Sequence, residues 1–144
     1  MTDSANTPYA GDLSPKETWE QLAAQPSAHL VDVRTQADWD FVGIPDLRTL
    51  ERQPHLISWQ VYPQMAVDPA FIDRVKAAGA KAGEPIFLLC RSGVRSKAAA
   101  IALTEVGLGP CYNILDGFEG NHDSHAHRGQ IAGWKASGLP WIQK

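Results

Sequence analysis

One short segment of the sequence combines a nucleophile with positive charge. Residues 90–96 are CRSGVRS, and they directly follow the apolar run PIFLL. Cationic groups near a thiol favour its thiolate form, which is the nucleophile. Positive charge comes from Arg91, Arg95 and Lys97, and no carboxylate lies between Glu84 and Glu105. The pattern predicts covalent chemistry at a cysteine, Cys90, with an anionic substrate or product.

The same loop has the features of an anion-binding turn. Gly93 permits the positive φ angle that a tightly curled loop needs. Backbone N–H groups in such a loop face inward, and the helix expected to begin near Ser96 adds its positive N-terminal end. We therefore expect the substrate to contact the loop, which consists of Arg91, Ser92, Gly93, Val94, Arg95 and Ser96.

Two reactions use a cysteine in such a loop. In sulfur transfer, the thiolate removes a sulfane sulfur from a donor and carries it as a persulfide to a nucleophilic acceptor. Cysteine phosphatases and arsenate reductases have a related loop, but the phosphatase pattern is His-Cys-x5-Arg. Here only four residues separate Cys90 from Arg95, and Leu89 replaces the histidine. The shorter loop favours sulfur transfer, and neither Asp116 nor Asp123 is obviously placed as a general acid.

A buried, inert cysteine is the competing interpretation of Cys90. Free cysteines are among the most buried residues, and this one ends an apolar run. In that case the protein is a non-catalytic binding or regulatory module, and Cys90 does not react with alkylating agents. The second cysteine, Cys111, opens an apolar segment, and we expect it in the core rather than as a resolving thiol.

Strand and helix patterns alternate along the chain. Ser14, Pro15 and Glu17 form a capping box with proline at the first helical position. Asp68 is expected to cap a later helix, followed by Pro69. Strands are expected at 29–34, 56–62, 85–90 and 111–117, and helices at 14–25, 35–43, 68–79, 96–107 and near the C-terminus. This alternation predicts an α/β domain with a mainly parallel sheet, and ligands of such sheets bind where strands end.

Composition limits the class of protein. The 144 residues carry a net charge of -3 and are 44% hydrophobic, as in a single globular domain without a basic nucleic-acid footprint. No apolar run approaches the about 20 residues of a membrane span. The polar start of the chain does not resemble a secretion signal. We expect a flexible leader at 1–11, a single domain at 12–144, and a cytoplasmic protein with reduced thiols that binds neither membrane nor nucleic acid.

Four motifs in order, LVDVR, CRSGVRS, NILDGFEG and GWKASGLPW, resemble the single-domain rhodanese (thiosulfate sulfurtransferase-like) family over residues 12–142. The resemblance implies a rhodanese-like, five-stranded, mainly parallel sheet flanked by helices on both faces. It implies a persulfide on Cys90, an anionic donor such as thiosulfate, a thiol, protein or cyanide-type acceptor, and no metal or organic cofactor. Asp32 and Arg34 match the family's Asp-x-Arg, which implies a site-supporting pair.

Two segments depart from the family pattern. The sequence FVGIPDL lacks the histidine that the family often has before the residue equivalent to Ile44. We interpret that position as structural, so the inference about the cysteine stands. The segment FEGNHDSHAHRGQ is longer than in a minimal rhodanese, and we expect it at the rim of the pocket. Its histidines, His122, His125 and His127, suit weak zinc or nickel binding, but a solvated loop is the favoured interpretation.

Overall fold

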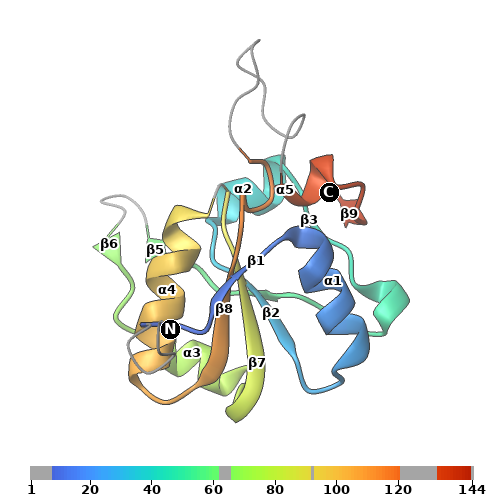
Figure 1. The fold of residues 1–144 in the computed structure, drawn as a ribbon. Helices are drawn as coiled ribbons and strands as arrows, with labels where there is room; N and C mark the ends of the chain where they lie inside the picture. The colour runs from blue at the N-terminus through green and yellow to red at the C-terminus, as the bar shows by residue number, and fades with distance from the viewer. Residues whose placement is uncertain (1–7, 62–65, 92, 121–132, 144) are drawn as a thin grey trace.

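The protein is built on one parallel sheet of five strands. In the computed structural model, which describes residues 8–61, 66–91, 93–120 and 133–143, the strand order is β1-β8-β7-β2-β4 (Figure 1). All four pairings between neighbouring strands are parallel. The strands are β1 (Gly11–Leu13), β2 (His29–Asp32), β4 (His55–Leu56), β7 (Ala82–Leu89) and β8 (Gly109–Ile114). The longest strand, β7, therefore lies at the centre.

Helices cover both faces of the sheet, as the sequence predicts. One face carries α1 (Pro15–Ala24) and α5 (Gly133–Ala136), and the other carries α3 (Phe71–Ala77) and α4 (Val94–Glu105) (Figure 1). Helix α2 (Gln36–Phe41) lies near the end of the sheet where the strands finish. The remaining elements are β3 (Ile44–Pro45) paired with β9 (Trp141–Ile142), β5 (Gln60–Val61) paired with β6 (Ala66–Val67), and the short 3-10 helix η2 (Arg48–Leu50).

The central strand divides its side chains between two buried clusters. Ile86, Leu88 and Cys90 pack toward α3 and α4, whereas Phe87 and Leu89 pack toward α1 and α5. All five residues are at most 1% exposed, because helices cover both faces of the strand. The continuous apolar run before Cys90 thus fixes the cysteine at the end of the central strand.

The helix starts are only partly as expected. The Ser14–Glu17 capping box is present, with the Glu17 N–H donating to Ser14 Oγ. The start of α3 differs, because its first residue is Phe71 and its N-cap is Ala70. Asp68 instead accepts the Ala70 N–H in a turn before the helix and forms an ion pair with Arg74. Helix α4 begins at Val94, two residues earlier than the expected start at 96.

The strand expected at 56–62 is wrong. Only His55 and Leu56 form strand pairs with β2. The Ile57 N–H still donates to the Asp32 carbonyl and the Trp59 N–H to the Val33 carbonyl, but without regular strand structure. Trp59 packs edge-on against Phe71 of α3, with ring centres 5.0 Å apart. Gln60 and Val61 pair with β6 in a separate hairpin. Two short elements therefore share an alternating pattern that suggests one strand.

Residues before the expected domain boundary at 12 are also part of the fold. Tyr9 is buried, the Ala10 N–H donates to the carbonyl of Cys111, and β1 starts at Gly11.

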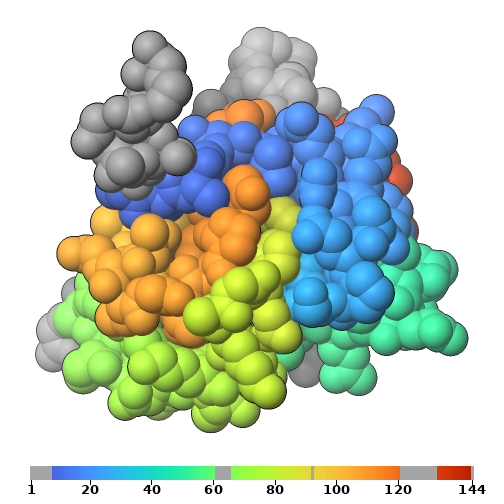
Figure 2. Space-filling model, turned by 60° about the horizontal axis from the view of Figure 1, so that its bottom comes forward, coloured from blue at the N-terminus to red at the C-terminus, as the bar shows by residue number. Residues whose placement is uncertain are grey.

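Figure 2 shows the end of the sheet where the strands begin, opposite the end that carries Cys90. There the segment at the start of β7 lies beside the segment at the start of β8, in agreement with the pairing of Ala82 and Gly109. Among the described residues, no helix has the length and apolar character needed to cross a membrane.

The capping box yields a stability prediction. Ser14→Ala removes the side-chain acceptor at the start of α1 and should lower the free energy of unfolding by about 1 kcal/mol. Denaturant titration measures the change. Ser27→Ala is the matched control in an exposed turn, and it should leave the midpoint nearly unchanged. Equal effects of the two substitutions would contradict the capping interpretation.

Candidate active site around Cys90

Cys90 lies immediately after the central strand, at the end of the sheet where the strands finish. The strand before it is held on both sides by β2 and β8. The Val33 N–H donates to the Leu89 carbonyl at 2.8 Å, so pairing continues up to the residue before the cysteine. Cys90 itself is 1% exposed. The sulfur therefore sits at the floor of the loop and not at its rim.

Two hydrogen-bonding groups face the sulfur. The Gly93 N–H donates to Cys90 Sγ at 3.0 Å, and Ser96 Oγ lies 3.2 Å from the same atom. Gly93 has a φ of 105°, a backbone conformation that residues with a side chain rarely adopt. It is the N-cap of the 12-residue helix α4. The positive end of that helix points toward the loop. The Gly93 N–H and the N-terminus of α4 thus favour a negatively charged sulfur.

The two arginines of the loop have different environments. Arg91 is exposed, whereas Arg95 Nη2 lies 3.9 Å from a carboxylate oxygen of Asp38 in α2. Arg95 thus lies close enough to Asp38 for a long ion pair between the loop and α2. Val94 is 75% exposed, so only its backbone belongs to the cradle, and Ser92 lies outside the described residues.

A second segment holds the loop from behind. The Phe118 N–H donates to the Cys90 carbonyl at 2.8 Å, and the N–H groups of Glu119 and Gly120 donate to the Arg91 carbonyl. A Cβ atom on Gly117 would lie 2.3 Å from the Cys90 carbonyl oxygen. Only glycine allows this close approach. Sequence reasoning did not assign these residues a role, although the closely spaced glycines 117 and 120 were a signal.

Asp32 and Arg34 form a fully buried ion pair. Arg34 Nη2 lies 2.6 Å from Asp32 Oδ2 and also donates to the Gly43 carbonyl at 2.7 Å. The guanidinium carbon lies 4.3 Å from the centre of the Phe118 ring. The pair therefore contacts the residue that holds the Cys90 carbonyl. It also ties β2 to the turn at Gly43.

Sequence reasoning missed a polar line that starts at the sulfur. Ser96 Oγ lies 2.5 Å from Asn113 Oδ1, and the Asn113 amide nitrogen donates to Asp12 Oδ1 at 3.1 Å. Tyr9 donates to the same Asp12 oxygen at 2.9 Å. Asp12 and Asn113 are direct partners in the pairing of β1 with β8. No local pattern in the sequence could have joined residues so far apart.

Cys111 occupies a different environment from Cys90. It is fully buried in the cluster under α4, and this burial raises the pKa of its thiol to about 11. Cys111 therefore stays protonated at neutral pH and packs as an apolar residue. The two cysteines are free in the structure.

Of the other residues that the sequence suggests for chemistry, the structure describes only Asp116. Asp116 is exposed, with a φ of 62°, while His122, Asp123, His125 and His127 lie outside the described residues. No group of three histidine, cysteine or acidic side chains suited to a metal ion occurs in the described part of the chain.

A separate polar cluster lies where β2, β4 and β7 meet. His29 Nε2 is 2.9 Å from Glu84 Oε1, and His29 Nδ1 is 3.2 Å from His55 Nε2. The hydrogen bond from His29 lowers the pKa of Glu84, and burial beside His29 lowers the pKa of His55. The cluster links three neighbouring strands and contains no nucleophile.

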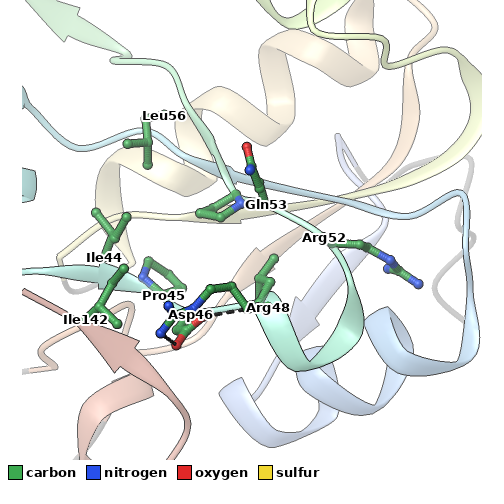
Figure 3. Close-up of a pocket in the computed structure, with 10 residues that line it drawn as sticks. Ile44, Pro45, Asp46, Arg48, Arg52, Gln53, Leu56 and Ile142 are labelled. Carbon is green, nitrogen blue, oxygen red and sulfur yellow. Dashed lines mark hydrogen bonds and ion pairs between the residues drawn. The ribbon is translucent and has the colours of Figure 1, made fainter.

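A pocket of about 250 Å³ lies away from the cysteine loop (Figure 3). Its described lining comes from residues 44–56 and Ile142 and contains no cysteine or serine. Asp46 and Arg48 form an ion pair at its side, and Arg52 points away from Ile44. This pocket has no group for covalent chemistry, so the cysteine loop remains the candidate active site.

Comparison with known proteins agrees with the fold. A family model described as the STR4 middle domain matches residues 10–144. The chain belongs to this family. The crystal structure of Rv0390 from M. tuberculosis is similar to this STR4 middle-domain chain at 45% identity, with a TM-score of 0.86, covering 94% of this chain and 99% of the other.

Two more distant structures share the fold. The polysulfide-sulfur transferase homodimer of Wolinella succinogenes has a TM-score of 0.64 at 21% identity, covering 98% of this chain and 83% of the other. A rhodanese-like domain protein of Staphylococcus aureus has a TM-score of 0.55 at 20% identity, covering 93% and 99%. At these identities the likeness concerns architecture alone. The STR4 middle-domain chain therefore has a rhodanese-like fold.

The buried ion pair can be tested by stability. Arg34→Met leaves the Asp32 carboxylate buried without its partner and should lower the free energy of unfolding by about 3 kcal/mol. Arg48→Met removes an exposed pair of the same sequence spacing, Arg48 with Asp46, and should have almost no effect. Chemical denaturation of both variants measures the difference. Similar losses in the two variants would contradict a supporting role for Arg34.

The close approach at Gly117 makes a second prediction. Gly117→Ala places a methyl group against the Cys90 carbonyl and should destabilise the fold strongly. Gly138→Ala is the matched control, because its φ is also positive, at 76°, but no atom lies within 4 Å of the added Cβ. The control should cost about 1 kcal/mol, from backbone strain alone. Thermal unfolding compares the two variants, and an equally mild Gly117→Ala would argue against a tight contact.

Proposed function

We propose that the protein is a sulfurtransferase that moves a sulfane sulfur through a persulfide on Cys90. The observation that carries the proposal is the Gly93 N–H, which donates to Cys90 Sγ at 3.0 Å. A backbone donor at this position stabilises negative charge on sulfur, whether the charge belongs to the thiolate or to the persulfide. The N-terminus of α4 adds to the same field.

The first half of the reaction loads the cysteine. The Cys90 thiolate attacks the outer sulfur of an anionic donor such as thiosulfate. A sulfur–sulfur bond forms on Cys90, the sulfur–sulfur bond of thiosulfate breaks, and sulfite leaves with the bonding electron pair. The negative charge of the thiolate is then carried by the outer sulfur of the persulfide. No net oxidation takes place, because the donor supplies sulfur at the required oxidation level.

The second half of the reaction transfers the sulfur from the Cys90 persulfide to an acceptor. A thiol, protein or cyanide-type acceptor attacks the outer persulfide sulfur, and the Cys90 thiolate leaves with the electron pair of the broken bond. With cyanide the product is thiocyanate. The exposed Arg91 attracts the anionic donor and acceptor to the loop. Arg95, which lies beside Asp38, mainly holds the loop against α2.

Several independent features support sulfur transfer over phosphate chemistry. Only four residues separate Cys90 from Arg95, and the backbone N–H of Gly93 is directed at the sulfur itself. The polysulfide-sulfur transferase of Wolinella succinogenes has the same architecture. Both cysteines are free, which fits a reducing compartment, and we propose the cytoplasm as the place of reaction.

One observation favours a second candidate function. Cys90 is 1% exposed, as expected for a rhodanese-fold module that binds a partner without turnover. The two candidates differ in reactivity. A sulfurtransferase must let a donor as large as thiosulfate reach the sulfur, whereas a binding module reacts neither with thiosulfate nor with a small alkylating agent.

A turnover assay tests the proposal. Purified protein given thiosulfate and cyanide should produce thiocyanate, and Cys90→Ala should reduce the rate to that of the uncatalysed reaction, because the persulfide carrier is gone. Cys111→Ala is the matched control and should keep activity, since Cys111 is a protonated core residue at neutral pH. Full activity in Cys90→Ala would contradict the proposal. Absence of activity together with an unalkylated Cys90 would establish the binding module.

A further inference from the structure

A continuous line of hydrogen bonds runs from the candidate nucleophile to the edge strand of the sheet. It passes from Cys90 Sγ to Ser96 Oγ, then to Asn113 Oδ1, and from the Asn113 amide nitrogen to Asp12 Oδ1. Tyr9 ends the line with a hydrogen bond to the same Asp12 oxygen. Cys90, Ser96 and Asn113 are at most 4% exposed, so water does not compete with the bonds that join these three residues.

The outer end of the line fixes the orientation of the Asn113 amide. Burial, the hydrogen bond to Asp12 and the charge of that carboxylate raise the pKa of Tyr9, so the Tyr9 hydroxyl remains a donor. An ionised carboxylate only accepts hydrogen bonds. The group of Asn113 that faces Asp12 must therefore be its NH₂ group. It follows that the carbonyl oxygen of the amide faces Ser96.

The inner end of the line is then decided by counting protons. A serine hydroxyl has one proton to donate. Ser96 Oγ lies 2.5 Å from Asn113 Oδ1, which can only accept, so the Ser96 proton points to Asn113. Ser96 therefore turns a lone pair toward Cys90 Sγ. That arrangement suits a protonated thiol, which donates to Ser96, and it opposes an anionic sulfur.

We propose that Asn113 is a positioning residue for the Cys90 sulfur, and that Asp12 sets its direction. With the Asn113 amide fixed by Asp12, the Ser96 proton points away from the sulfur and the neutral thiol is favoured. To stabilise an anionic sulfur, the Ser96 hydroxyl must rotate toward Sγ and break its hydrogen bond to Asn113 Oδ1. The line thus opposes the charged sulfur, while the Gly93 N–H favours it.

The proposal deepens the proposed function and rests on it for its biological meaning. The persulfide and the thiolate are both anionic. Formation of the persulfide and deprotonation of Cys90 should therefore both rotate the Ser96 hydroxyl toward the sulfur. Asn113 and Asp12 then hold the unloaded cysteine as a thiol, which reacts slowly with other electrophiles. The physical claim itself concerns only the proton on Cys90.

Other charged groups lie on the elements around Cys90 and must be kept constant. They lie on its own loop, on α4, on the neighbouring strand ends and on α2. These groups are Arg91, Arg95, Lys97, Asp32, Arg34, Asp38 and Asp116. Most are paired or exposed, and none is altered in the variants below.

The experiment measures ionisation of Cys90 without any sulfur donor. The ultraviolet absorbance of the thiolate is titrated against pH, and the matching Cys90→Ala protein is subtracted. Asn113→Leu has a similar shape and removes the acceptor, so the Ser96 proton is free for the sulfur. The midpoint should move to lower pH by about one unit, the size of one hydrogen bond to a charged group.

A second variant keeps the test decisive if Asn113→Leu does not fold. Asp12 is exposed on the three-residue edge strand β1, so Asp12→Ala should fold. It releases the Asn113 amide and should shift the midpoint in the same direction. Tyr9→Phe is the control, since it leaves Asp12 charged and Asn113 oriented, and it should cause no shift.

A Ser96→Ala background separates the hydrogen-bond line from simple electrostatics. Without the hydroxyl, Asp12→Ala should no longer move the midpoint, whereas loss of a charge acting through space would still do so. A shift to higher pH, no shift in a folded Asp12→Ala, or a shift that persists without Ser96 would overturn the proposal. The result does not depend on turnover, so a protein inactive with thiosulfate can still show the shifts, and an active one can lack them.

Discussion

The carbonyl group of Cys90 is held by the Phe118 N–H, and Gly117 packs against it more closely than any side chain would allow. This contact joins the end of the central strand to the segment that follows β8. Because β7 is buried on both faces, the strand cannot shift to relieve a change at this point. The position of the sulfur therefore depends on two segments that meet at one peptide group.

The remaining parts of the site are arranged around that contact. The Arg34 guanidinium, paired with Asp32, lies over the Phe118 ring, and Arg95 lies near Asp38 on the other side of the loop. Two sets of groups then have opposite effects on the ionisation of the sulfur. The Gly93 N–H and the N-terminus of α4 favour an anion, and the Ser96 hydroxyl, oriented by Asn113, favours a thiol. A cysteine balanced in this way suits a carrier that alternates between a free and a sulfur-loaded form.

Local signals in the sequence predicted the elements better than the contacts between them. The capping box at Ser14 and the apolar run before Cys90 depend on near neighbours, and both lie where expected. The strand expected at 56–62 failed because Trp59 packs on a helix, which alternation cannot reveal. Asn113 and Asp12 could not be foreseen, because they meet the loop only through pairing of β1 with β8.

The central claim is that Cys90 carries sulfur, and mass spectrometry of the whole protein after treatment with thiosulfate tests it most directly. The account predicts a mass increase of one sulfur atom, found on the peptide that contains Cys90 and removed by cyanide or a reductant. Cys90→Ala should show no increase. A wild-type protein that gains no sulfur, or that gains it on Cys111, would contradict the account.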